Sequence, residues 1–246
     1  MQTFQTSTVE TYYKKLSLLF EGQSLSDPVG KLDIDKILDK LGLIKHSNQF
    51  SQSKNAFLQF CKFQSISLSV DTLERIRTLE ADTRKKRRQL KAVNYSDIDK
   101  KIKRLRDKRL KLSYQTMLAT GLRVSELADI SPANCKIAND SITFSFTARG
   151  GAKAVTTVHS AEYPKLYIDL QALIESTIQS QHKRLFYSTN FLQRKAKALG
   201  FGCHDLRRVF AKLEYKKSQS KIAVAKKMRH KSLKATKIYL HSKVKI

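Results

Sequence analysis

A run of five basic residues, about a third of the way along the chain, constrains the fold more than any other feature. Before this run, Arg84-Lys85-Lys86-Arg87-Arg88, apolar residues recur at the spacing of amphipathic helices. After it the composition changes, and a second patterned region begins near residue 94. Such a charge run is typical of a solvated segment. We therefore expect a helical N-terminal domain over residues 1–83, a basic linker over 84–93 and a second domain over 94–246.

The second domain combines helices with one stretch of strand. Ser96 is the expected N-cap of its first helix, and Gly121 is expected to end a later helix in a left-handed C-cap. Apolar residues then alternate over 142–146, and a Gly-containing turn at 149–153 returns the chain through 155–158, which predicts a β-hairpin with a basic tip. Further helices are expected over 166–180, 191–199, 205–217, 219–228 and 233–240. The predicted fold class is mainly α with a small β-hairpin or sheet.

The charge of the chain points to a polyanionic partner. Lys and Arg number 48 against 21 Asp and Glu, for a formal net charge of +27. Residues 84–111 alone hold fourteen basic and three acidic residues, which suits either a solvated linker or a strap across a nucleic acid duplex. The sequence has no apolar run of ~18 residues that would indicate a membrane segment. Nucleic acid is the preferred partner, with no membrane.

Neither a disulfide framework nor a metal site is expected. The three cysteines, Cys61, Cys135 and Cys203, are odd in number, widely spaced and without a Cys-x-x-Cys pair. Cys203 could be a thiol nucleophile, although a small buried residue before a helix is the preferred interpretation. The first residues lack the pattern of a secretory signal, so we expect an intracellular, cytoplasmic protein.

Five residues outside the hairpin suit chemistry on a phosphodiester without a metal. Such chemistry needs a nucleophile, cations that stabilise the non-bridging oxygens, and proton donors or acceptors. Arginine binds phosphate with a planar fork that stays protonated, and histidine transfers protons near neutral pH. A tyrosine hydroxyl becomes a useful nucleophile only among cations that favour its phenolate. In chain order the candidates are Arg123, His204, Arg207, His230 and Tyr239.

These residues lie in motifs that resemble those of the tyrosine recombinases of the phage-integrase and Xer group. The motifs are Thr120-Gly121-Leu122-Arg123-Val124-Ser125-Glu126-Leu127, His204-Asp205-Leu206-Arg207, and His230 followed by Tyr239, and the resemblance covers about residues 94–241. It implies that residues 1–83 form a DNA-binding (core-binding) domain and residues 94–246 a catalytic domain. Tyr239 would attack the scissile phosphate to form a 3′-phosphotyrosyl link, without a cofactor. Four protomers would pair two DNA recombination sites and exchange strands through a Holliday junction.

The resemblance also assigns roles to the remaining candidates. Arg123 and Arg207 would hold the non-bridging oxygens, His204 would handle the tyrosine proton, and His230 would donate a hydrogen bond to the phosphate. The i, i+3 spacing of His204 and Arg207 agrees with this, since both would share one helical face. Glu126 is expected to orient Arg123. A hairpin lysine of the family protonates the leaving 5′-oxygen, and Lys153 is preferred to Arg149 because arginine is a poor proton donor.

Several questions stay open at the level of sequence. Where the family commonly has Leu-Gly before the second histidine, this chain has Met228-Arg229. A type IB topoisomerase-like nicking and closing enzyme, and a DNA-binding protein of the same fold without activity, are the alternative functions. The target sequence, the direction of recombination, any accessory proteins and assembly of the site in cis or in trans are not determined.

Overall fold

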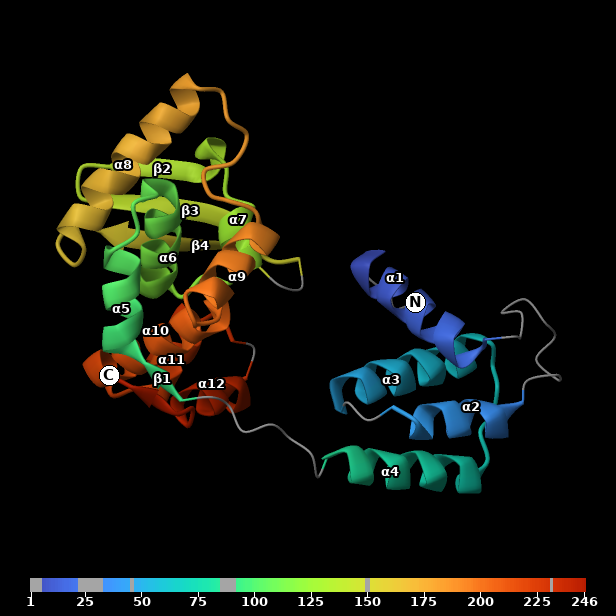
Figure 1. The fold of residues 1–246 in the computed structure, drawn as a ribbon. Helices are drawn as coiled ribbons and strands as arrows, with labels where there is room; N and C mark the ends of the chain where they lie inside the picture. Colours follow the sequence, from blue (N-terminus) through green and yellow to red (C-terminus); the bar gives the residue numbers. More distant parts are fainter. Residues whose placement is uncertain (1–5, 22–32, 45–46, 85–91, 149–150, 231) are drawn as a thin grey trace. The chain divides into compact units, whose positions relative to one another are not determined.

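The computed structural model describes residues 6–21, 33–44, 47–84, 92–148, 151–230 and 232–246. The chain divides into two compact units, Met1–Gln89 and Leu90–Ile246 (Figure 1). Arg149, the alternative to Lys153, and most of the expected linker lie outside the described residues. No helix in the described ranges has both the length and the apolar character needed to cross a membrane.

The N-terminal unit is helical throughout its described elements. Apolar side chains from all of its helices meet in one core that includes Phe20, Leu41, Phe57 and Ile76. Asp33 begins the second helix by accepting a hydrogen bond from the amide of Lys36 at 3.0 Å. The helices are α1 (Thr6–Leu19), α2 (Ile34–Gly42), α3 (Ser47–Phe63) and α4 (Val70–Arg84).

The second unit places helices around a small antiparallel sheet, as the predicted fold class requires (Figure 1). The sheet has the strand order β2-β3-β4, formed by Cys135–Ala138, Ser141–Thr147 and Lys153–His159. The expected hairpin is β3 and β4, whose pairing runs from Ser141 with His159 to Thr147 with Lys153. Ile142, Phe144 and Phe146 are buried on one face, which confirms the alternation. Strand β2 was not expected.

The helices of this unit agree with the predicted segments to within a few residues. Helix α6 packs against α8, β4 and α10, and so lies between the sheet and the C-terminal helices. The helices are α5 (Tyr95–Lys103), α6 (Lys108–Thr120), α7 (Val124–Ala128), α8 (Pro164–Gln179), α9 (Thr189–Ala198), α10 (Cys203–Ser218), α11 (Lys221–Lys227) and α12 (Leu233–Leu240), with a 3-10 turn, η2, over Pro132–Asn134.

The expected N-cap at Ser96 is wrong by two residues. Asn94 caps α5 instead, because its side-chain oxygen accepts a hydrogen bond from the amide of Ser96 at 3.0 Å. Asn94 also belongs to β1 (Val93–Asn94), which pairs in parallel with β5 (Val244–Lys245). The strand that follows α12 is thereby tied to the segment that precedes α5.

Candidate active site

A left-handed turn at the end of α6 sets the position of Arg123. Gly121 has a φ of 63°, and its amide donates to the carbonyl of Met117 at 2.9 Å. This is the predicted C-cap, which glycine adopts without the strain that a Cβ would add. Leu122 is fully buried and fixes the turn, so the next residue, Arg123, begins α7 at a defined place.

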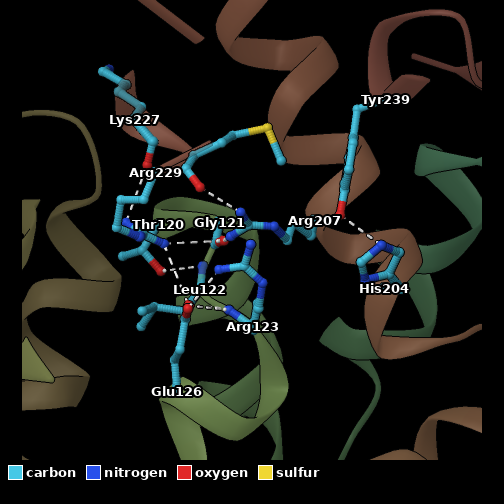
Figure 2. A network of polar contacts seen from close by, with 11 residues as sticks. Thr120, Gly121, Leu122, Arg123, Glu126, His204, Arg207, Lys227, Arg229 and Tyr239 are labelled. Atoms are coloured by element: carbon cyan, nitrogen blue, oxygen red, sulfur yellow. Dashed lines mark hydrogen bonds and ion pairs between the residues drawn. The ribbon is translucent and has the colours of Figure 1, made fainter. Parts of the chain in front are cut away.

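Glu126 orients Arg123, as expected. Its Oε2 accepts from the backbone amide of Arg123 at 2.8 Å, and its Oε1 accepts from Nη1 of the same residue at 2.7 Å. Burial alone would raise the pKa of Glu126, but these hydrogen bonds and the charges of Arg123 and Arg229 lower it below its ordinary value. The carboxylate is therefore ionised and holds the Arg123 guanidinium toward the site (Figure 2).

Helix α10 carries both His204 and Arg207, one turn apart. Arg207 is fully buried, and its Nη1 and Nη2 donate to the carbonyls of Gly121 and Met228. A guanidinium has five N–H groups, so about three of them are not used by these two carbonyls. Arg207 thus joins the end of α6 to the end of α11 and adds positive charge between them (Figure 2).

Tyr239, on α12, directs its hydroxyl at His204. The hydroxyl lies 2.6 Å from Nε2 of His204, and the centre of the tyrosine ring lies 5.9 Å from Cζ of Arg207. The ring packs against the small apolar cluster around Phe210 and Met228. Tyr239 therefore lies beside His204 and Arg207 of its own chain (Figure 2).

The pKa of His204 is lowered, mainly by desolvation and next by the positive charge of Arg207. At neutral pH the imidazole is uncharged and its Nε2 can accept the phenolic proton from Tyr239.

The ring centre of His230 lies 5.0 Å from that of Tyr239. Its Nδ1 is hydrogen-bonded at 2.9 Å to Oγ1 of Thr236, a fully buried residue. Burial, and then the charges of Arg207 and Arg123, lower the pKa of His230 to about 4. Because Nδ1 is engaged, a substrate would meet Nε2 of a neutral imidazole.

A groove with a volume of about 680 Å³ opens beside these groups. Arg123, His204 and Arg207 line it together with Gln193 and Lys197 of α9. Neither Gln193 nor Lys197 belongs to a motif, so sequence analysis did not single them out. The structure thus brings together Arg123, His204, Arg207, His230 and Tyr239, although up to 116 positions separate them in the sequence.

Lys153 is not joined to this cluster. It is exposed at the first position of β4, and within the described ranges no hydrogen bond or ion pair links its side chain to the other candidates.

Cys203 is buried at the start of α10, and burial raises the pKa of its thiol to about 11, which does not favour a thiolate. No group of three or more His, Cys, Asp or Glu side chains that could hold a metal occurs in the described part of the chain.

Two arginines and an uncharged imidazole that line a groove, with a second uncharged imidazole and a phenol close by, define a site suited to binding phosphate groups. The chain belongs to the phage integrase family, a family of tyrosine recombinases, and the family model matches residues 87–245. It is 27% identical over 159 residues to the tyrosine recombinase XerA of Saccharolobus solfataricus (strain ATCC 35092 / DSM 1617 / JCM 11322 / P2), an alignment that covers 63% of this chain. That alignment spans 54% of the length of XerA.

Solved structures share the fold. The recombinase XerH in a post-cleavage complex with palindromic difH has a TM-score of 0.64 at 17% identity, over 96% of this chain and 75% of XerH. The Tn1549 transposon integrase (aa 82-397) in complex with circular intermediate DNA gives 0.64 at 14% identity, over 96% and 90%. A lambda integrase tetramer on a Holliday junction gives 0.60 at 17% identity, over 94% and 73%.

Proposed function

We propose that this chain is a site-specific DNA recombinase that cleaves and rejoins DNA through a covalent bond between Tyr239 and a 3′-phosphate. The observation that carries the proposal is the distance of 2.6 Å between the Tyr239 hydroxyl and Nε2 of His204, beside the buried Arg207. A nucleophile, a proton acceptor and a cation then meet at one point, which is what attack on a phosphodiester needs.

In the proposed reaction the Tyr239 oxygen forms a bond to phosphorus, and the bond from phosphorus to the 5′-oxygen breaks. His204 accepts the phenolic proton, while Arg123 and Arg207 bind the non-bridging oxygens as negative charge grows on them. His230 donates a further hydrogen bond to the phosphate. Lys153 supplies a proton to the leaving 5′-oxygen, which requires the hairpin tip to approach the groove when DNA is bound. Rejoining reverses these steps, and no cofactor or metal takes part.

We further propose that the substrate is a pair of double-stranded recombination sites held by four copies of this chain in the cytoplasm. Residues 1–83 would serve as the core-binding domain, residues 84–93 as the basic linker along the duplex, and residues 94–246 as the catalytic domain. The net charge of +27 supports a DNA partner. The fold likeness to a lambda integrase tetramer bound to a Holliday junction supports four copies.

A nicked suicide substrate made from DNA that flanks the gene tests the proposal, because loss of the short cleaved strand traps the covalent complex. The unmodified protein should form this complex, and Tyr239→Phe should bind the DNA without forming it. Tyr215→Phe is the matched control, since Tyr215 packs against the same apolar cluster as Tyr239. It should still form the complex.

Covalent trapping by Tyr239→Phe would refute the choice of nucleophile. Relaxation of a supercoiled plasmid that lacks any such site would instead indicate a type IB topoisomerase-like enzyme. DNA binding by the unmodified protein without cleavage of any flanking fragment would indicate a binding protein that has the fold alone.

A further inference from the structure

Arg229 occupies a backbone position that normally selects glycine. Its φ is 55°, directly after α11 and its C-cap residue Met228. Its amide donates to the carbonyl of Lys226 at 3.0 Å, and the amide of His230 donates to Ala225 at 3.0 Å, so the turn closes the helix in a left-handed conformation. A side chain with a Cβ is strained in this conformation. Contacts of the arginine side chain help to offset that strain.

Those contacts lead back into the candidate site. Cζ of Arg229 lies 5.0 Å from the centre of the Phe146 ring on β3, and its side chain is 15% exposed. Its Nη2 lies 3.7 Å from Oε2 of Glu126 and donates to the carbonyl of Gly121 at 3.4 Å. Its Nη1 donates to the carbonyl of Lys227 at 3.1 Å. Figure 2 shows the guanidinium on the side of Glu126 and Gly121 opposite the tyrosine.

Both groups that Arg229 contacts in the site already hold a candidate arginine. Glu126 binds the amide and guanidinium of Arg123, and the Gly121 carbonyl accepts from Arg207. The side chain at position 229 therefore braces the two acceptors that fix Arg123 and Arg207. Fixing such donors before the reaction is what makes them effective in a transition state.

Arg229 adds to a local excess of positive charge. Burial lowers its pKa to about 10, although the charge of Glu126 opposes this, so it remains protonated at neutral pH. Arg123, Arg207 and Arg229 face one carboxylate, Glu126, which leaves two positive charges in excess. A phosphodiester attacked by a phenolate carries two negative charges, one from each reactant. His204 gains a further positive charge as it takes the phenolic proton, so the site is positive where this negative charge grows, which favours the transition state of the proposed reaction.

We propose that Arg229 is a positioning residue for strand cleavage, which acts through Glu126 and the Gly121 carbonyl to hold Arg123 and Arg207 against the scissile phosphate. This inference rests on the proposed function. It assigns a role to the arginine that this chain has where the family commonly has the glycine of Leu-Gly. Arg229 would act through other residues and would not itself touch the reacting atoms.

The test compares Arg229→Lys with Arg229→Met in the whole 246-residue chain, on the suicide substrate described above. Both variants keep a Cβ in the left-handed turn and a long side chain, and only the lysine keeps the charge. Arg229→Met should slow covalent complex formation on the order of 100-fold, the loss expected when reacting groups are misplaced by about 1 Å. Arg229→Lys should recover part of this rate, and the affinity of both variants for DNA should stay within about twofold of the unmodified protein.

A second substrate separates positioning from a structural role. A methylphosphonate at the scissile position has one methyl group in place of a charged oxygen, so its reaction depends less on the arginines. The loss caused by Arg229→Met should be several-fold smaller on this substrate. Gln181→Gly is the backbone control, because Gln181 also has a positive φ, of 54°, and is exposed after α8. It should cleave both substrates at the unmodified rate.

Cleavage of the phosphodiester by Arg229→Met at the unmodified rate would overturn the inference while the proposed function stands. An equal loss on both substrates would also overturn it, because it would show a turn that merely folds poorly. If the unmodified protein forms no covalent complex on either substrate, the proposed function fails, and the inference fails with it.

Discussion

The left-handed turn at Gly121 makes the position of Arg123 sensitive to a single methyl group. A Cβ added at Gly121 would lie 2.3 Å from Cδ1 and 2.6 Å from Cε1 of Phe210, a residue that is 3% exposed. The φ of 63° adds backbone strain for any residue other than glycine. Gly121→Ala therefore combines two penalties at the point where α6, α10 and the candidate site meet.

The expected loss of stability is the sum of these penalties. The left-handed conformation costs alanine about 1 to 2 kcal/mol, and overpacking against a buried ring costs about 1 to 3 kcal/mol, so Gly121→Ala should lose about 2 to 5 kcal/mol. Gly200→Ala separates the two, because Gly200 has a φ of 84° but its added Cβ would meet only the flexible Nζ of Lys101, at 3.3 Å. That variant should lose about 1 to 2 kcal/mol.

Urea unfolding followed by circular dichroism measures both losses, on the transition of the unit that contains the mutated residue. Phe210→Leu completes a double-mutant cycle with Gly121→Ala, because the smaller leucine side chain makes room for the added methyl group of the alanine. The loss from the double variant Gly121→Ala/Phe210→Leu should be smaller than the two single losses together, by more than about 0.5 kcal/mol. Equal losses for Gly121→Ala and Gly200→Ala, or strict additivity with Phe210→Leu, would refute the steric reasoning.

Three further outcomes are expected. Arg207→Ala should destabilise the protein by about 1 to 3 kcal/mol, because the Met228 carbonyl loses its buried donor and the Gly121 carbonyl keeps only the longer bond from Arg229, at 3.4 Å; an unchanged urea midpoint would contradict this. The pKa of His230 falls from 6.5 to about 4 on folding, so between these values the unfolded chain binds more protons. Stability should therefore fall as the pH is lowered through this range, and His230→Gln should flatten the dependence of the urea midpoint on pH. Cys203→Ala should form the covalent DNA complex as the unmodified protein does, because burial raises the thiol pKa to about 11 and so disfavours a reactive thiolate; loss of the complex with an intact fold would reopen the thiol mechanism.

Local signals in the sequence predicted most of the fold of the second unit. The alternation of Ile142, Phe144 and Phe146 predicted β3, since a buried face must repeat every second residue. Gly121 predicted the turn before Arg123 because few other residues adopt a positive φ there. Each of these features depends on neighbours within a few positions, so the sequence could reveal it.

Features that depend on distant partners could not be predicted in this way. Strand β2 is short, none of its residues is buried, and it pairs with β3 through its backbone, so it has no alternating pattern. The two residues of β1 form a strand only because β5, about 150 positions later, lies beside them. Asn94 replaced Ser96 as the N-cap because β1 sets where α5 begins.

The sequence motifs could predict which residues belong to the candidate site. They could not predict which of these residues contact one another. The motifs named Arg123, His204, Arg207, His230 and Tyr239, because the chemistry of a phosphodiester limits which side chains are useful. They did not show that Arg207 would be fully buried, or that Arg229 would turn toward Glu126. Lys153 rested on the resemblance alone, and its role remains a prediction for the DNA-bound protein.

Two left-handed turns, at Gly121 and at Arg229, explain why structure and chemistry cannot be separated in this site. The first turn presents the Gly121 carbonyl to Arg207, and the second follows the Met228 carbonyl that Arg207 also binds. Arg207 can therefore occupy its position only when the ends of α6 and α11 are both closed. Because the helix that carries Arg207 also carries His204, the same two turns set where the partner of the Tyr239 hydroxyl lies. A change in either turn should consequently affect the cleavage rate and the stability of the fold together, whereas Tyr239→Phe, which keeps the ring packed against Phe210 and Met228, should affect mainly the cleavage rate.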